Sequence, residues 1–268
     1  MSEMMRLNIR HVTSYDYDGP VPYGLLQLRM TPRPGATQNV IAWKTTVAGG
    51  KMQLAFDDQH SNRVELLAFD PGTTALQIIS EGVVEVRDAA GVTGLHQGYA
   101  PLWLFERPTP RTQSGAKVRA LVASISKGLP SLEAMHVLMA AVSDAVRYKI
   151  GETDSGTTAE EALTLGQGVC QDHAHVFISA ARLMGYPARY VSGYLSSDGD
   201  SDAAHAWAEA YLPDLGWVGF DAANSICPDA RYVRVATGLD YAEAAPVSGT
   251  RHGPAEERLS VNVVVQQQ

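Results

Sequence analysis

The chain has 268 residues, 45% of them hydrophobic and 19% charged, which is typical of a folded globular protein and excludes an intrinsically disordered one. Its formal net charge is −8, and no cluster of Lys and Arg occurs along it, which argues against a nucleic-acid partner. No apolar run approaches the roughly 20 residues of a membrane helix, and the N-terminus lacks the apolar stretch of a signal peptide. We therefore expect a cytoplasmic protein with no membrane partner.

The first hundred residues contain short segments in which polar and apolar side chains alternate, the pattern of half-buried β-strands. Turn-forming Gly, Pro, Asn and Asp residues separate these segments at intervals of roughly ten residues, as in a β-sandwich or barrel. The segments are LNIRHVTSYDYD, VPYGLLQLRMTP, NVIAWKTTVAGG, KMQLAFDDQHSN, RVELLAF and LQIISEGVVEVRD. They predict a β-sandwich-like domain over residues 1–108, which ends at the Pro- and Gly-rich stretch 107–115.

After this stretch the periodicity becomes helical. KVRALVASISKG predicts a helix that ends at Gly128, and a second helix is expected after Pro130. Thr158 and Glu161 have the spacing of a capping box and predict a short helix that ends near Gly166. The apolar face of the second helix would consist of Met135, Leu138, Met139, Val142 and Val146.

The next segment, GQGVCQDHAHVFISAARLMG, predicts a Gly-rich turn that leads into a helix with Gly185 at its C-terminus. PARYVSGYL, HAWAEAYL and GWVGFDAAN predict three strands, the last two joined by a turn near Pro213. The acidic segment 196–203, SSDGDSDA, separates the first two of these strands and is a candidate lid over a cleft. ERLSVNVVVQQQ predicts one more strand at the C-terminus.

Cys170 lies where the Gly-rich turn meets the predicted helix. A helix N-terminus stabilises a thiolate through its unpaired N–H groups and the positive end of its dipole. The same N–H groups can stabilise the oxyanion of a tetrahedral intermediate, and Gly166 and Gly168 would let a substrate carbonyl approach the backbone. Cys170 is thus a candidate nucleophile, and the alternative is a buried structural cysteine, the role that we assign to Cys227.

A nucleophilic thiol also requires a base and a group that orients the base. His205 begins one predicted strand, and Asp221 lies near the end of the next. A five-residue connection, 212–216, would pair Tyr211 with Trp217 and put His205 and Asp221 on one face within side-chain reach. A four-residue connection would put them on opposite faces, because a shift of one residue exchanges the two faces. The Cys-His-Asp hypothesis therefore depends on the longer turn or on a bulge.

The sequence GQGVCQDHAHVFISAARLMGYPARYVSGYL, followed by HAWAEAYLPDLGWVGFDAAN, closely resembles the core of the transglutaminase-like superfamily. In that family a Cys begins a helix, a His begins a strand and an Asp lies on the neighbouring strand. The matching positions are Cys170, His205 and Asp221. LNIRHVTSYDYDGPVPYGLLQLRMTPRP also resembles the β-rich module that precedes this core in many bacterial members, and the resemblance extends to the tail VATGLDYAEAAPVSG.

This resemblance implies an α+β fold, in which the β-sandwich-like domain over residues 1–108 precedes a papain-like transglutaminase core over residues 109–240. In the core, the helix that carries the cysteine packs on an antiparallel sheet. Residues 241–268 would form a C-terminal tail with a final strand. Because that strand would be exposed, it could pair between chains and form a homo-oligomer.

The resemblance also implies thiol acyl transfer through a thioester intermediate. Cys170 would attack an amide or peptide carbonyl, His205 would transfer the proton, and Asp221 would orient the imidazole. The acyl group would then pass to water or to an amine acceptor. We expect hydrolysis of a peptide, protein or other amide, as in a cysteine peptidase or amidase, in preference to cross-linking, and we expect no cofactor and no metal.

Four further residues are candidates for roles around this site. Gln167 and Gln171, on either side of the cysteine, could donate to the oxyanion or could be ordinary loop and helix amides. Trp207 could line the cleft or pack in the core, and Asn224 could support the acidic residue three positions before it.

The nearby Asp172, His173 and His175 are expected to be structural, with Arg189 as a candidate partner for Asp172.

Two other interpretations remain open at this stage. Cys170, His173 and His205 could supply three ligands to zinc, although paired metal cysteines and an H-E-x-x-H motif are absent. Alternatively, the chain could be a non-catalytic protein-binding module built on the transglutaminase fold.

Overall fold

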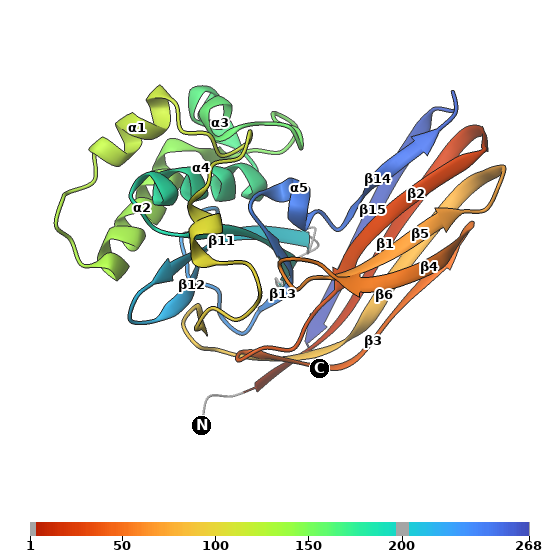
Figure 1. Ribbon diagram of the computed structural model, residues 1–268, viewed down its shortest axis with the longest axis horizontal. Helices are drawn as coiled ribbons and strands as arrows, with labels where there is room; N and C mark the ends of the chain where they lie inside the picture. The colour runs from red at the N-terminus through yellow and green to blue at the C-terminus, as the bar shows by residue number, and fades with distance from the viewer. Residues whose placement is uncertain (1–3, 197–203, 268) are drawn as a thin grey trace.

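The computed structural model describes residues 4–196 and 204–267 and consists of a β-sandwich beside an α+β unit (Figure 1). Residues 197–203 of the candidate lid, which was predicted over 196–203, lie outside the described residues. The sandwich and the antiparallel sheet of the α+β unit confirm the predicted fold class. None of the helices in residues 4–196 and 204–267 is long and apolar enough to cross a membrane, and the cytoplasmic location stays a prediction.

The sandwich consists of two four-stranded antiparallel sheets whose alternating apolar residues face each other. Along β1, for example, every second residue from Leu7 to Tyr15 is buried, and the residues that alternate with them are more exposed. One sheet has the order β15 (Glu257–Gln267), β1 (Met4–Val21), β6 (Thr73–Arg87), β3 (Gln38–Ala48). The other has the order β14 (Val247–His252), β2 (Tyr23–Thr31), β5 (Arg63–Phe69), β4 (Gly50–Asp57).

The C-terminal segment returns to this sandwich and adds one strand to each sheet (Figure 1). The final strand was predicted and is β15, which pairs with β1 from Leu7↔Gln267 to Tyr17↔Glu257. The sequence did not indicate β14, which pairs with β2 and whose residues VSGTRH lack an apolar alternation. The sandwich therefore contains both ends of the chain. The domain limits at residues 108 and 240 and the homo-oligomer stay predictions.

The α+β unit places its helices against a five-stranded antiparallel sheet (Figure 1). The sheet has the order β13 (Tyr232–Gly238), β10 (Ala188–Leu195), β11 (Ala204–Leu212), β12 (Gly216–Phe220), β7 (Val92–Gly94). The helices are the 3₁₀ helix η1 (Leu102–Glu106), α1 (Ala116–Ala123), α2 (Ser131–Ala145), α3 (Ala159–Leu165), α4 (Cys170–Leu183) and α5 (Tyr241–Ala244). A short parallel pair, β8 (Arg147–Tyr148) and β9 (Gln167–Gly168), precedes α4.

Local sequence signals account for most of these elements. The predicted apolar face of α2 is buried from Met135 to Val146. The capping box is present, because Glu161 N–H donates to Thr158 Oγ1 and Thr158 N–H donates to the Glu161 carboxylate. Gly166 ends α3 in the left-handed region with φ 64°. Helix α1 differs from its prediction, since it ends at Ala123 rather than at Gly128.

A buried carboxylate holds the centre of the five-stranded sheet. Glu209 on β11 is 1% exposed and accepts a hydrogen bond from Arg189 Nε at 2.6 Å and from Arg234 Nε at 2.8 Å. Burial alone would raise the pKa of Glu209, but the charges and hydrogen bonds of the two arginines lower it. The expected pairing of Arg189 with Asp172 is therefore wrong, because Glu209 on the neighbouring strand takes that arginine.

We expect Glu209→Gln to lower the free energy of unfolding by about 3–5 kcal/mol, since it leaves two guanidinium groups without their shared carboxylate. Urea denaturation at pH 7 measures this loss. Glu81→Gln is the matched control, because Glu81 also lies between two cations, Arg10 and Lys44, but on the surface, and should lose far less. Equal losses in the two variants would contradict a structural role for the buried carboxylate.

Candidate active site

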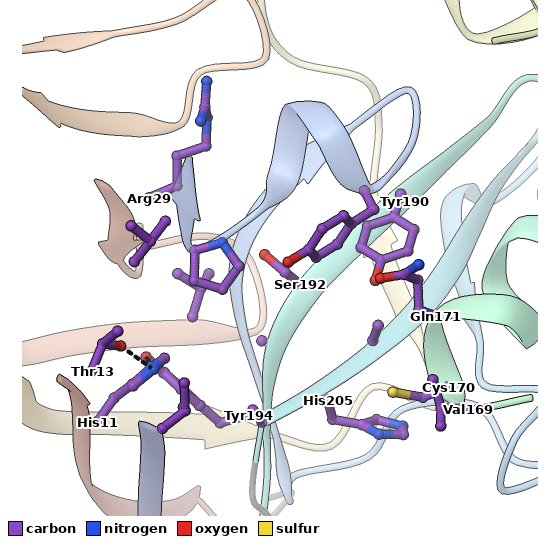
Figure 2. A pocket seen from close by; sticks show the side chains of 18 of the residues that line it. His11, Thr13, Arg29, Val169, Cys170, Gln171, Tyr190, Ser192, Tyr194 and His205 are labelled. Atoms are coloured by element: carbon purple, nitrogen blue, oxygen red, sulfur yellow. Dashed lines mark hydrogen bonds between the residues drawn. The ribbon is translucent and has the colours of Figure 1, made fainter. Parts of the chain in front are cut away.

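Cys170 is the first residue of α4 and lies at one end of a cavity of about 320 Å³ (Figure 2). It is half-buried, and its sulfur lies beside the imidazole of His205, whose pKa it helps to raise. The first N–H groups of a helix have no intrahelical acceptor and point toward a ligand at its N-terminus. The cysteine thus combines the helix-end position expected from the sequence with a histidine partner.

Asp172 shapes the loop that presents this cysteine. Its Oδ2 accepts hydrogen bonds from Val169 N–H and from Thr153 Oγ1, each at 2.7 Å. A Cβ at Gly168 would lie 2.6 Å from the same oxygen, so glycine is required where the carboxylate folds back. Burial raises the pKa of Asp172, while these hydrogen bonds oppose that shift. Asp172 is therefore a structural residue of the loop, as predicted.

The register of β11 and β12 brings His205 and Asp221 together. Tyr211 pairs with Trp217 and Leu212 with Gly216, so the predicted pairing is confirmed and the alternative with the shorter connection is excluded. Continued along the strands, this register puts His205 diagonally beside Asp221 on one face. The imidazole Nε2 lies 2.6 Å from Asp221 Oδ2, and the two side chains are 9% and 1% exposed.

The electrostatics of this group favour charge separation. Burial by itself would lower the pKa of His205, but hydrogen bonds with Asp221 and Cys170, together with their charges, raise it to about 10. Burial would raise the pKa of Asp221, and the hydrogen bonds and charge of its neighbours, led by His205, lower it. At neutral pH the imidazole is therefore an imidazolium and the carboxyl a carboxylate.

Asp221 is held by more donors than the histidine alone. Asn224 Nδ2 donates to Oδ2 at 2.7 Å and lies 3.3 Å from His205 Nε2, so this predicted candidate does reach the site. The hydroxyl of Tyr232 donates to the same oxygen at 2.8 Å. Sequence reasoning missed Tyr232, because it starts β13, which joins the far side of β10, and no local pattern announces that placement.

Trp207 packs against the ring of His205 and does not line the cavity that contains Cys170. It is 3% exposed, and its ring lies 6.4 Å from that of His205 at an interplanar angle of 24°. Gly193 pairs with His205 across β10 and β11. It makes space for the indole of Trp207, because a Cβ at this position would lie 2.7 Å from that ring. Trp207 thus packs in the core, one of the two roles expected for it.

The two glutamine candidates differ in position. Gln171 lines the cavity beside Cys170, and its Nε2 donates to the carbonyl of Asp154 at 3.3 Å (Figure 2). Gln167 precedes α4 in β9 and is not among the residues that line the cavity. Of the two amides, the structure therefore brings only Gln171 to the cavity that holds the thiol.

The far wall of the cavity comes from the β-sandwich. His11 and Thr13 of β1 line it, together with Leu259 and Val261 of β15, and most of the lining is apolar (Figure 2). Burial lowers the pKa of His11 to about 4, so this histidine is neutral at neutral pH, and its Nδ1 lies 3.0 Å from the hydroxyl of Tyr194. Neither the sandwich nor the α+β unit forms this cavity alone.

The zinc interpretation has no support in the residues proposed for it. Within residues 4–196 and 204–267, no three His, Cys, Asp or Glu side chains are grouped to hold a metal ion. His173 is occupied by protein, because its ring nitrogens lie 2.8 Å from the carbonyl oxygen of Val169 and 2.6 Å from that of Val146. Cys227 lies outside the cavity, and burial raises the pKa of its thiol.

Comparison with known proteins agrees with this architecture. The model of the transglutaminase-like superfamily matches residues 119–222, and that of the bacterial transglutaminase-like N-terminal region matches residues 7–85. The chain belongs to the transglutaminase-like superfamily. The superfamily match includes Cys170, His205 and Asp221.

The chain is similar to several bacterial proteins, over lengths that differ from one to the next. An uncharacterised protein of Mycobacterium leprae is 28% identical over 98% of this chain and 99% of its own length. The solved structure of a candidate cysteine protease from Cytophaga hutchinsonii has the same fold, with a TM-score of 0.82, 22% identity and coverage of 99% of this chain and 91% of its own. A protein-glutamine gamma-glutamyltransferase of Pseudomonas aeruginosa is 29% identical over 102 residues, 32% of this chain and 15% of its own.

Proposed function

We propose that this superfamily member is a thiol acyl-transfer enzyme that hydrolyses an amide or peptide bond. Cys170 is the nucleophile, His205 the general acid and base, and Asp221 the residue that orients the imidazole. The observation that carries the proposal is the row of side chains in which Cys170 lies beside His205 and His205 lies 2.6 Å from Asp221, with the thiol and the imidazole lining one cavity.

The proposed reaction has two steps. The thiolate of Cys170 attacks the carbonyl carbon, a C–S bond forms, and the imidazolium of His205 donates its proton to the leaving amine as the C–N bond breaks. His205 then takes a proton from water, whose oxygen attacks the thioester carbon; the C–S bond breaks, the acid is released, and the Cys170 thiolate and the imidazolium are restored. N–H groups at the start of α4 and the side chain of Gln171 are the candidate donors to the oxyanion.

The cavity favours a peptide or protein substrate with an apolar side chain near the scissile bond, because most of its lining is apolar. We favour hydrolysis over cross-linking, since water needs no binding site, whereas an amine acceptor must be held against the thioester. The cysteine protease description of the Cytophaga hutchinsonii structure supports hydrolysis, and the gamma-glutamyltransferase name of the Pseudomonas aeruginosa relative supports amine transfer. An amine acceptor is therefore included in the assays below.

The thiol–imidazole pair is tested by the pH dependence of iodoacetamide alkylation, with the modified cysteine identified by mass spectrometry. Because the pKa of His205 is raised to about 10, the imidazolium that supports a thiolate persists from acid pH to near that value and is lost above it. We expect Cys170 to react readily at pH 6, and His205→Ala to slow this reaction at least about tenfold.

The raised pKa of His205 should also make the free energy of unfolding depend on pH. The raised pKa of His205 stabilises the fold fully below the unfolded value of about 6.5 and progressively less as pH rises toward 10.

Cys227 is the internal control for alkylation, since its thiol pKa is raised by burial. If Cys170 is alkylated slowly and at the same rate in the wild type and in His205→Ala, the thiol–imidazole pair is rejected and the non-catalytic binding module is favoured.

A further inference from the structure

A second cavity, of about 290 Å³, lies on the opposite face of the five-stranded sheet from Cys170. Along β10, Arg189 lines this cavity while the next residue, Tyr190, lines the first one, because successive side chains of a strand point to opposite faces. Its walls come from the connection between β2 and β3, the connection between β4 and β5, the segment after β7, and strands β10, β12 and β13. It is thus a separate site at the junction of the two units.

The charged residues that line this cavity are all cationic. Arg33, Arg189 and Arg234 contribute guanidinium groups, and no Asp or Glu of the described part of the chain lines it. Glu209 pairs with Arg189 and Arg234, and Asp57 pairs with Arg33, so two carboxylates offset part of the charge of three guanidinium groups. In a chain of net charge −8, this cavity therefore concentrates positive charge.

Arg189 presents its guanidinium group to this cavity. The residue is 8% exposed, and its guanidinium carbon lies 3.9 Å from the centroid of the Trp217 ring. Its Nε donates to Glu209. Burial lowers the pKa of Arg189 to about 10, so it stays charged at neutral pH. A charged N–H donor that lines a cavity forms strong hydrogen bonds with a ligand group that supplies oxygen atoms and negative charge.

We propose that this cavity binds a small molecule through a phosphate or carboxylate oxyanion, which the terminal nitrogens of Arg189 and the guanidinium groups of Arg33 and Arg234 hold. The planar fork of arginine matches both kinds of group with paired N–H···O bonds. The volume, near the lower limit of about 300 Å³ for ligand pockets, fits a small metabolite rather than a peptide. The proposal stands independently of the chemistry at Cys170.

Isothermal titration calorimetry of the full chain in chloride buffer tests this site, with inorganic phosphate and citrate as separate probes. We expect saturable binding of at least one probe, with a Kd in the range of about 10 μM to 1 mM. Arg234→Gln should weaken binding at least about tenfold, and Arg33→Gln should weaken it less, since it is closer to the surface. Arg10→Gln on the outer face of the sandwich is the matched control and should leave the Kd unchanged.

Two further measurements show where the ligand binds and which chemical class it belongs to. The indole N–H resonance of Trp217, which lines the cavity, should shift during the titration, and that of the exposed Trp103 should not. Binding of phosphate alone assigns a phosphate-bearing ligand, and binding of citrate alone assigns a carboxylate. Circular dichroism verifies that Arg234→Gln is folded, and Arg33, 42% exposed, supplies a variant outside the buried ion pair. No saturable binding up to about 10 mM, or an unchanged Kd in both arginine variants, overturns the proposal.

Discussion

Cys170→Ala should reduce kcat for amide hydrolysis by about 10⁶-fold, to the level of the reaction without a nucleophile. The expected cause is loss of the sulfur that forms the thioester, since His205 and Asp221 keep their hydrogen bond without it. Because Cys170 is half-buried at the cavity surface, we expect little change in the thermal unfolding temperature. Release of amine and acid from a panel of peptide amides, followed by mass spectrometry, measures the effect.

The control for this variant is Cys227→Ala, which changes the second thiol of the chain outside the cavity and should retain turnover. The same assay with an added primary amine separates hydrolysis from transfer, and we expect the acid as the main product. Full turnover by Cys170→Ala on a substrate that the wild type cleaves would reject the nucleophile. Amide products in place of acid would reject hydrolysis and retain the thioester.

Asp221→Asn should reduce kcat by about 10³–10⁴-fold while Cys170 can still be alkylated. The amide no longer stabilises the imidazolium by charge, so the pKa of His205 should fall from its raised value near 10. Because a less stable imidazolium stabilises the thiolate less, the acid limb of the alkylation profile should move to higher pH. Steady-state kinetics and the alkylation profile measure the two effects on the same preparation.

Tyr232→Phe and Asn224→Ala are the matched comparisons, because each removes one hydrogen bond to Asp221 and keeps its charge. Each should lower kcat far less than Asp221→Asn and leave the alkylation range nearly unchanged. An Asp221→Asn variant with the turnover and alkylation profile of the wild type would show that the carboxylate does not orient the base.

The sequence predicted those parts of the fold that depend on neighbouring residues. The apolar face of α2, the capping box of α3 and the start of α4 at Cys170 follow from side chains within a few positions of each other. The register of β11 and β12 did not follow, because the sequence allowed a four-residue or a five-residue connection, and the structure has the pairing that puts His205 and Asp221 on the same face.

Other features could not be predicted, because they join residues that only the order of strands brings together. Tyr232 reaches Asp221 since β13 lies beside β10, and Arg189 pairs with Glu209 rather than with Asp172 since β10 and β11 are neighbours. The pairing of β14 with β2 likewise depends on a strand far away along the chain.

By itself, the sequence determined the helix that begins at Cys170 and the strands that carry His205 and Asp221, because local periodicity encodes each of them, and its resemblance to the superfamily core indicated the family. Only the tertiary structure decided that the β-sandwich forms the far wall of the cavity and that three arginines meet behind the sheet. Both features bring together segments more than a hundred residues apart, whose contacts depend on packing between units and not on any local pattern.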